Sequence, residues 1–293
     1  MAFNFQAFKT RALTAIIFSI VMLTGLLWNH WSFFILFSII HFGCWFEYQK
    51  IISHIDADYK EISDFHKYGV MLAGWAIMLW MTNDAFAIAN FRLHELGWWI
   101  LLVCAVVLPI TEVLFTSTHH LKTIGYSLAG LIYISLSWGL MMEIRSEGMW
   151  MQNRVLYMDF GWIMPIVLVA SIWINDTMAY LVGSFIGKSP LSSISPKKTW
   201  EGTIGGALLC IAIVASVGHY LYHLNLVNLI VISSTAAVAG TLGDLLESKL
   251  KRLAGIKDSG NIMPGHGGFL DRFDSLILAT PFVWIYVMFI MDK

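Results

Sequence analysis

The sequence predicts an all-α, polytopic integral membrane protein, a helical bundle with about nine transmembrane helices. Of its 293 residues, 58% are hydrophobic and only 13% are charged, against roughly 25% charged in an ordinary soluble domain. Long stretches without any charged residue recur along the chain. A transmembrane helix needs about 20 mostly apolar residues to cross roughly 30 Å of hydrocarbon. The stretches are too long and too uniformly apolar for barrel strands, whereas helices satisfy their own backbone groups in lipid.

Nine segments have the length and the apolar character of a membrane span. They are residues 12–28, 30–46, 68–82, 97–115, 124–142, 160–187, 202–223, 224–243 and 275–291. Their only acidic residues are Glu112 and Asp176. The first segment follows Lys9 and Arg11, as in a signal peptide, but no small-residue cleavage site follows it. We therefore expect this segment to be a retained helix.

Positive charges divide unequally between the two sides that nine crossings create. Fourteen of the 18 Lys and Arg residues fall on the side that holds the amino terminus and the loops after the second, fourth, sixth and eighth helices. The other side carries Arg92, Arg145, Arg154 and Lys293. Because cytoplasmic loops carry the excess of Lys and Arg, we expect the amino terminus in the cytoplasm and the carboxy terminus outside.

Several other classes of protein are disfavoured. A net charge of -1 offers no excess of basic groups for a nucleic-acid backbone. Cys44, Cys104 and Cys210 are odd in number and lie in apolar runs, which favours neither a disulfide framework nor a zinc site. With six prolines and no linker or repeat, we expect a single domain over residues 1–293. Its dense polar clusters, and therefore its chemistry, are expected in residues 173–275.

The sixth segment carries the first polar cluster. Asp176, Thr177 and Tyr180 share one face of a helix at 3.6 residues per turn, and Asn175 adjoins them. An ionisable residue inside a membrane is costly unless it is paired or solvated. Asp176 is therefore either a functional residue or a structural acid bonded to a neighbouring helix. The glycines of the run 183–189 lack the spacing of a phosphate-binding P-loop.

The second cluster joins the sixth and seventh segments. Its residues are Ser195, Pro196, Lys197, Lys198, Thr199, Trp200, Glu201 and Gly202. Two adjacent lysines beside hydroxyl groups suit a polyanion, although a lysine pair by itself is more often a positive-inside anchor. The glycines at 202, 205 and 206 either admit a ligand or let two helices pack closely.

The third cluster spans residues 243–275 and concentrates acids, cations and glycines. On a helix that continues from the eighth segment, one face carries Asp244, Glu247, Ser248 and Lys251. Asp271 and Asp274 are similarly spaced at the start of the ninth helix. Carboxylates from two helices, with cations between them and a glycine-rich loop, are suited to hold a divalent ion and phosphates.

His266 lies among three glycines within this cluster. It could donate a hydrogen bond to a phosphate oxygen or act as a general base. Because a phosphate nucleophile is already ionised near pH 7, no base is required. We therefore expect substrate binding rather than proton transfer from this histidine.

The third cluster resembles the signature of the phosphatidate cytidylyltransferase (CDP-diacylglycerol synthase) family. From Ser248 to Asp274 it reads S-x-L-K-R, four residues, K-D-x-G, then P-G-H-G-G, two residues, D-R-x-D. The first two clusters also resemble motifs of this family, so the resemblance covers about residues 173–275. Met263 stands where the pattern has Leu, Ile or Phe. Ser184 stands where relatives usually carry Arg, which either weakens one phosphate or headgroup contact or transfers it to Lys188.

The resemblance implies a homodimeric enzyme of the inner (cytoplasmic) membrane. Such an enzyme transfers CMP from CTP to phosphatidic acid, giving CDP-diacylglycerol and pyrophosphate. The lipid phosphate would attack the α-phosphorus of CTP in line, while Mg²⁺ and cationic side chains neutralise the charge on the oxygens. A monovalent cation is a second candidate cofactor. The active site would open to the cytoplasm.

The resemblance also assigns roles to individual residues. It implies metal ligation by Asp244 and Asp271, and catalysis by these two acids together with Lys251 and Arg272. The substrate-binding residues that it implies are Asn175, Asp176, Tyr180, Ser195, Lys197, Lys198, Thr199, Glu201, Ser248, Arg252, Lys257, Asp258, His266, Gly267, Gly268 and Asp274.

Two alternative functions remain open at this point. The first is another CTP-dependent lipid enzyme, either a cytidylyltransferase for a different lipid phosphate or a lipid-alcohol kinase. A kinase would need a base, for which His266 and Asp258 are the candidates. The second is an ion-coupled transporter in which Asp176 binds the ion. The absence of paired interrupted helices in corresponding halves of the sequence argues against a transporter.

Overall fold

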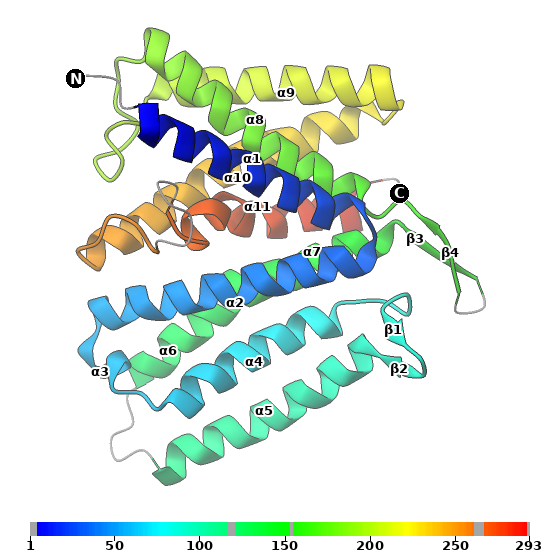
Figure 1. Cartoon of the computed structure of the whole chain (residues 1–293), viewed down its shortest axis with the longest axis vertical. Coiled ribbons are helices and arrows are strands. Elements are labelled where there is room, and N and C mark those ends of the chain that lie inside the picture. Colours follow the sequence, from blue (N-terminus) through cyan, green and yellow to red (C-terminus); the bar gives the residue numbers. More distant parts are fainter. Residues whose placement is uncertain (1–4, 116–120, 153–154, 261–266, 292–293) are drawn as a thin grey trace. The chain divides into compact units, whose positions relative to one another are not determined.

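The computed structural model describes residues 5–115, 121–152, 155–260 and 267–291. Within these ranges the chain is almost entirely helical, with one π-helical stretch and two small hairpins (Figure 1). The helices are α1 (Phe5–Leu27), α2 (His30–Ile55), α3 (Ala57–Lys60), α4 (Asp64–Trp80), α5 (Leu93–Phe115), α6 (Leu121–Gly130), the π-helix η1 (Leu131–Leu136), α7 (Ser137–Glu147), α8 (Ile163–Ile186), α9 (Trp200–Tyr222), α10 (Leu226–Leu253) and α11 (Leu270–Phe289).

Each of the nine predicted segments coincides with a helix, and the fifth coincides with the continuous run α6–η1–α7. Seven helical segments of the described chain are long and apolar enough to span a membrane, and Ala12–Leu27 is a shorter apolar helix. The seven are His30–Ile55, Leu93–Leu114, Lys122–Glu147, Ile163–Ile186, Trp200–Tyr222, Leu226–Leu253 and Leu270–Phe289. An all-α polytopic membrane bundle is therefore confirmed. The count of nine crossings and the cytoplasmic amino terminus stay predictions.

Two antiparallel hairpins were not predicted. Between α4 and α5, strand β1 (Ala87–Ile88) pairs with β2 (Phe91–Arg92). Between α7 and α8, strand β3 (Met149–Gln152) pairs with β4 (Val155–Asp159). Strands of two to five residues are too short to give the alternation of apolar and polar residues by which a strand is recognised.

The chain divides into two compact units. Unit 1 comprises residues 1–162 and 253–273, and unit 2 comprises residues 163–252 and 274–293. The chain passes from one unit to the other three times. The third polar cluster is consequently divided between them. The single domain expected from the sequence stays a prediction.

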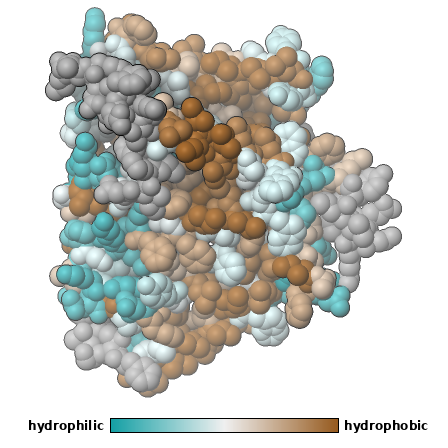
Figure 2. All heavy atoms as spheres, in the orientation of Figure 1, coloured by the Kyte–Doolittle hydropathy of each residue, from teal (hydrophilic) through white to brown (hydrophobic). Residues whose placement is uncertain are grey.

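Unit 1 contains a layer of long apolar helices. Helix α4 packs against α5, and α2 packs against both α1 and α4; Figure 1 shows α2, α4 and α5 side by side. In Figure 2, apolar atoms cover the length of α5, whereas polar atoms gather around α3. Near the end of α5, Val113 and Leu114 are 65% and 68% exposed. Such apolar exposure is expected of a helix that faces lipid.

Polar side chains inside unit 1 are paired with one another. The intramembrane acid Glu112 accepts a hydrogen bond from His66, with Oε2 and Nδ1 separated by 3.1 Å. The other ring nitrogen of His66 lies 3.0 Å from the hydroxyl oxygen of Ser127. In the last turn of α7, the buried guanidinium of Arg145 forms two 2.5 Å hydrogen bonds with Asp159. Glu112 thus has a structural partner within its own unit.

Unit 2 is built on a close contact between α8 and α9, which glycines permit. A Cβ on Gly206 would lie 2.6 Å from the Cα of Ala179, and one on Gly202 would lie 2.9 Å from the Cα of Gly183. Both distances are shorter than real Cβ contacts. Of the two readings of this glycine cluster, the structure therefore favours helix packing over ligand access.

This packing predicts a specific loss of stability. Gly206→Ala should lower the midpoint of thermal unfolding in detergent, because overpacking costs about 1–3 kcal/mol where the backbone must move. The matched control is Gly125→Ala in α6, where nothing lies within 4 Å of an added Cβ. Since alanine is the better helix former by about 1 kcal/mol, the control should be neutral or stabilising. Equal shifts in the two variants would contradict the close-packing account.

Candidate functional site

In unit 2, Lys198 lies among acidic residues from three helices. Its ammonium group forms an ion pair with Asp244 of α10. Asp176 of α8 and Asp274 of α11 also interact with it electrostatically. Burial lowers the pKa of Lys198, while the charges of Asp176 and Asp274 raise it. We call these four residues, Asp176, Lys198, Asp244 and Asp274, the Lys198 cluster.

The helices approach closely beside this cluster. A Cβ on Gly243 would lie 2.5 Å from the carbonyl oxygen of Asp274, so only glycine allows α10 to come so near α11. The same approach brings Asp274 within electrostatic reach of Glu247. On α8, Asn175 is only 3% exposed, and its side-chain oxygen accepts no hydrogen bond from the residues that the structure describes. Carboxylates from α8, α10 and α11 thus surround one lysine.

The loop that carries Lys198 is held in place at both of its ends. The carboxylate of Glu201 accepts hydrogen bonds from the backbone N–H groups of Lys188 and Ser189, each at 3.1 Å. The hydroxyl of Thr199 caps the first turn of α9. Two residues predicted to bind substrate, Glu201 and Thr199, therefore make contacts that fix the position of Lys198.

On α10 the predicted polar face is present. Glu247 is fully buried and forms an ion pair with Lys251 one turn further along, with Oε2 and Nζ 2.5 Å apart. Ser248 is half-buried, and Arg252 is exposed at the end of the helix. A buried acid thereby holds the Lys251 ammonium close to α10.

Asp271 lies in unit 1, where the backbone folds around its carboxylate. Its Oδ2 accepts hydrogen bonds from the N–H groups of Ser259 and Gly268, both at 2.9 Å, and from the Ser259 hydroxyl at 2.8 Å. Gly267 has a φ of +83°, a conformation that side chains disfavour. A Cβ at Gly267 would also lie 2.7 Å from this carboxylate oxygen. A glycine at 267 therefore lets the backbone approach the Asp271 carboxylate closely.

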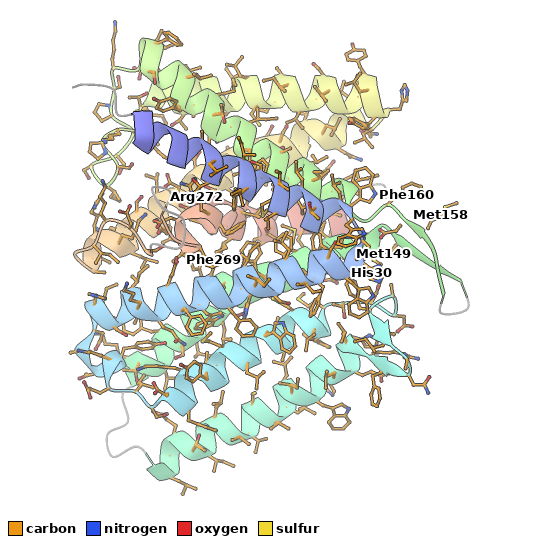
Figure 3. The ribbon with its side chains drawn as sticks, in the orientation of Figure 1. His30, Met149, Met158, Phe160, Phe269 and Arg272 are labelled. Carbon is orange, nitrogen blue, oxygen red and sulfur yellow. The ribbon has the colours of Figure 1, made fainter. Side chains whose placement is uncertain are left out.

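Glu47 of α2 was not among the residues predicted from the sequence. This residue is 6% exposed, and its carboxylate accepts hydrogen bonds from the N–H groups of Phe269 and Leu270, at 2.9 and 2.8 Å. Figure 3 shows Phe269 together with Arg272 at the start of α11. The second predicted segment is defined as a run without charged residues, so it ends at residue 46, immediately before this acid. The available signal was a lone acid within a helix that continues to Ile55.

The other predicted residues are more exposed. Lys257 and Asp258, in the segment after α10, are exposed. Tyr180 of α8, Lys197 before α9 and Arg272 of α11 are exposed as well. Ser195 is half-buried. Ser184 is exposed, and its hydroxyl donates to the backbone carbonyl of Tyr180 at 2.6 Å. His266 and Met263 lie outside the described residues.

Each unit carries residues whose chemistry suits ions. Asp176, Asp244 and Asp274 of unit 2 and Asp271 of unit 1 offer carboxylate oxygens, the donors that hard divalent cations take. Within the part of the chain that the structure describes, no three His, Cys, Asp or Glu side chains are gathered as a ready metal site. Lys198, Lys251, Arg252 and Arg272 supply positive charge suited to phosphate oxygens.

Comparison with known proteins identifies the family. The cytidylyltransferase family matches residues 9–290. Phosphatidate cytidylyltransferase of Bacillus subtilis is 34% identical over 212 residues, 71% of this chain and 75% of the relative. The enzyme of the same name from Staphylococcus saprophyticus is 33% identical over 223 residues, 75% of this chain and 79% of the relative. Chloroplastic phosphatidate cytidylyltransferase 4 of Arabidopsis thaliana is 41% identical over 128 residues, 43% of this chain and 33% of the relative. The chain therefore belongs to the cytidylyltransferase family.

Proposed function

We propose that this membrane protein is a phosphatidate cytidylyltransferase, which transfers CMP from CTP to phosphatidic acid and releases pyrophosphate. The observation that carries the proposal is the signature from Ser248 to Asp274, in a chain whose relatives over more than two thirds of its length bear that name. A multi-pass helical bundle also suits a substrate that resides in the bilayer.

The reaction requires neutralisation of the phosphate charges and alignment of the attacking and leaving groups more than it requires proton transfer. An oxygen of the lipid phosphate forms a bond to the α-phosphorus of CTP, the bond from that phosphorus to the bridging oxygen breaks, and pyrophosphate leaves. Lys198, Lys251, Arg252 and Arg272 would bind the phosphate oxygens of the two substrates. Because the lipid phosphate is already ionised near pH 7, the described acids are better suited to hold cations than to serve as a base.

A divalent cation, Mg²⁺, is the proposed cofactor, with Asp244 and Asp271 as its ligands. Their carboxylate oxygens are of the type that Mg²⁺ prefers, and the buried side-chain oxygen of Asn175, which has no hydrogen-bond partner among the described residues, is a further candidate ligand atom in unit 2. When bound, Mg²⁺ would neutralise charge on the phosphate oxygens and on the departing pyrophosphate. The backbone N–H groups of Ser259 and Gly268 that donate to Asp271 would hold its carboxylate in one orientation.

The cellular arrangement is part of the same proposal. We place the protein in the inner (cytoplasmic) membrane with its site on the cytoplasmic side, where CTP is found. The excess of Lys and Arg in the loops after the even-numbered predicted helices supports this orientation. A homodimer, implied by the family resemblance, is proposed on that ground alone.

The proposed reaction predicts which phosphorus of CTP reaches the lipid. Purified protein in mixed micelles is given phosphatidic acid, Mg²⁺ and CTP labelled at either the α- or the γ-phosphorus. Label from the α-position should enter the lipid, because cytidylyl transfer moves CMP. Label from the γ-position would instead show kinase chemistry. Incorporation of neither label by folded protein would contradict this substrate and favour another lipid acceptor or the transporter.

Replacing a proposed metal ligand should remove activity without unfolding the protein. Asp271→Asn keeps the shape of the side chain but loses its charge, so we expect turnover to fall by about 100-fold or more, as for loss of charge stabilisation at a reacting phosphate. Helical content, measured by circular dichroism, should stay unchanged. Glu95→Gln on α5, which alters an exposed acid paired with Arg92, is the control and should keep full turnover.

Lys198 should contribute to binding of the anionic substrates. Lys198→Ala should raise the KM for CTP or for phosphatidic acid by about tenfold or more, since a hydrogen bond to a charged group contributes about 1.5–3 kcal/mol. The matched control is Lys60→Ala, which removes an exposed lysine of α3. Wild-type KM values for both substrates in Lys198→Ala would count against its phosphate-binding role.

A further inference from the structure

The carboxylate of Glu47 joins segments that are far apart in the sequence. Its Oε2 accepts hydrogen bonds from the Ser259 hydroxyl at 2.6 Å and from the Leu270 N–H at 2.8 Å. Its Oε1 accepts one from the Phe269 N–H at 2.9 Å. These partners are 212 to 223 residues away along the chain. One side chain of α2 therefore connects the segment after α10 with the beginning of α11.

The surrounding glycines make room for this carboxylate. A Cβ added at either Gly260 or Gly268 would lie 2.2 Å from Glu47 Oε1. One turn before Glu47, a Cβ added at Gly43 would lie 2.2 Å from the ring of Phe269. The signature glycines at 260 and 268 are thus required by a residue outside the signature.

The hydrogen bonds explain why an acid is tolerated at this buried position. The first N–H groups of a helix have no partner within the helix, and the positive end of the helix dipole lies there. Leu270 begins α11 and Phe269 precedes it, so Glu47 satisfies two such N–H groups with charge-assisted hydrogen bonds. These two N–H groups compensate the buried charge, and the Ser259 hydroxyl, which Glu47 shares with Asp271, adds to them.

The same contacts reach Asp271 through Ser259 and Gly268. The Ser259 hydroxyl oxygen lies 2.6 Å from a Glu47 oxygen and 2.8 Å from Asp271 Oδ2. A hydroxyl has one hydrogen, so it can donate to only one of these carboxylates at a time. The N–H groups of Ser259 and Gly268 both donate to Asp271. Fixing these two residues therefore fixes the orientation of the Asp271 carboxylate.

We infer that Glu47 is a positioning residue for the reaction. It anchors Ser259, Gly268 and the start of α11 so that the carboxylate of Asp271 keeps a single orientation. In this role Glu47 acts through these neighbours. The inference rests on the proposed role of Asp271, and it adds to the site a residue from the first half of the chain.

The test is Glu47→Gln, which replaces one carboxylate oxygen by an NH2 group. That group cannot accept the hydrogen bonds that the replaced oxygen accepts from Phe269, or from Leu270 and Ser259. We expect kcat per folded molecule to fall by about 10–100-fold, the usual effect of losing a group that orients a metal ligand. The KM values for CTP and phosphatidic acid should change by less than about threefold, because binding contacts are intact. Hydrogen exchange should become faster at the backbone amides of residues 268–270.

Matched variants separate positioning from general destabilisation. Glu112→Gln makes the same chemical change at a mostly buried acid of unit 1 that is bonded to His66, and it should keep the wild-type kcat. Glu47→Asp restores the charge with a shorter side chain and should recover part of the lost kcat. If Glu47→Gln cannot be purified in folded form, Ser259→Ala removes only the hydroxyl between the two carboxylates and should also lower kcat.

Three results with the variants of Glu47, Glu112 and Ser259 would overturn the inference. They are a wild-type kcat per folded molecule in Glu47→Gln, an equal loss of kcat in Glu112→Gln, and, where the first variant does not fold, a wild-type kcat in Ser259→Ala. An inactive Asp271→Asn combined with a fully active Glu47→Gln would reject the positioning role alone. An active Asp271→Asn would reject the proposed role of Asp271, and with it the inference.

Discussion

Charged groups among apolar helices must be paired or hydrogen-bonded, and this constraint decides where the polar side chains of both units lie. In unit 1, Glu112 is held by His66, and the start of α11 supplies N–H groups to Glu47. In unit 2, the ammonium of Lys198 lies among the carboxylates of its cluster, and Lys251 pairs with the buried Glu247. Since an uncompensated charge at such depth costs several kcal/mol, each pairing constrains the helices that carry the partners.

The same constraint connects the fold with the proposed chemistry. An enzyme that joins a nucleotide to a lipid phosphate must attract several negative charges to the edge of an apolar bundle. Cationic side chains alone would suffice to bind these negative charges. The Lys198 cluster also contains acids, whose charge a metal ion would balance. The two carboxylates proposed as metal ligands differ in their surroundings. Asp244 is paired with a lysine, while Asp271 is surrounded by backbone and hydroxyl donors.

Much of the fold could be predicted from the sequence because hydrophobicity alone marks a helix that must lie in lipid. All nine predicted apolar segments are helical in the structure. Helices α2 and α10 continue beyond their predicted segments into charged residues. The two hairpins were missed since strands this short carry no periodic signal. The glycines at 202 and 206 could not be interpreted, because whether a glycine serves packing or a ligand depends on the helix opposite.

The site was only partly predictable for a related reason. The acids and the lysine of the Lys198 cluster all lie in the three polar clusters of the sequence, but the partner of each is set by tertiary contacts. Nothing in the sequence pairs Lys198 with Asp244 or places Glu47 beside residues more than 200 positions away. Glu47 is the instructive case, because its contacts are made by Ser259, Gly268 and the start of α11, which lie against it only in the folded chain.

Direct metal binding tests the proposal that Asp244 and Asp271 hold a divalent cation. Mn²⁺ can replace Mg²⁺ as a paramagnetic probe, and electron paramagnetic resonance measures the free ion in the presence of the purified protein. The account predicts that the wild-type protein and Glu112→Gln reduce the free Mn²⁺ signal, whereas Asp244→Asn and Asp271→Asn do not. Wild-type Mn²⁺ binding in both aspartate variants would contradict the proposal.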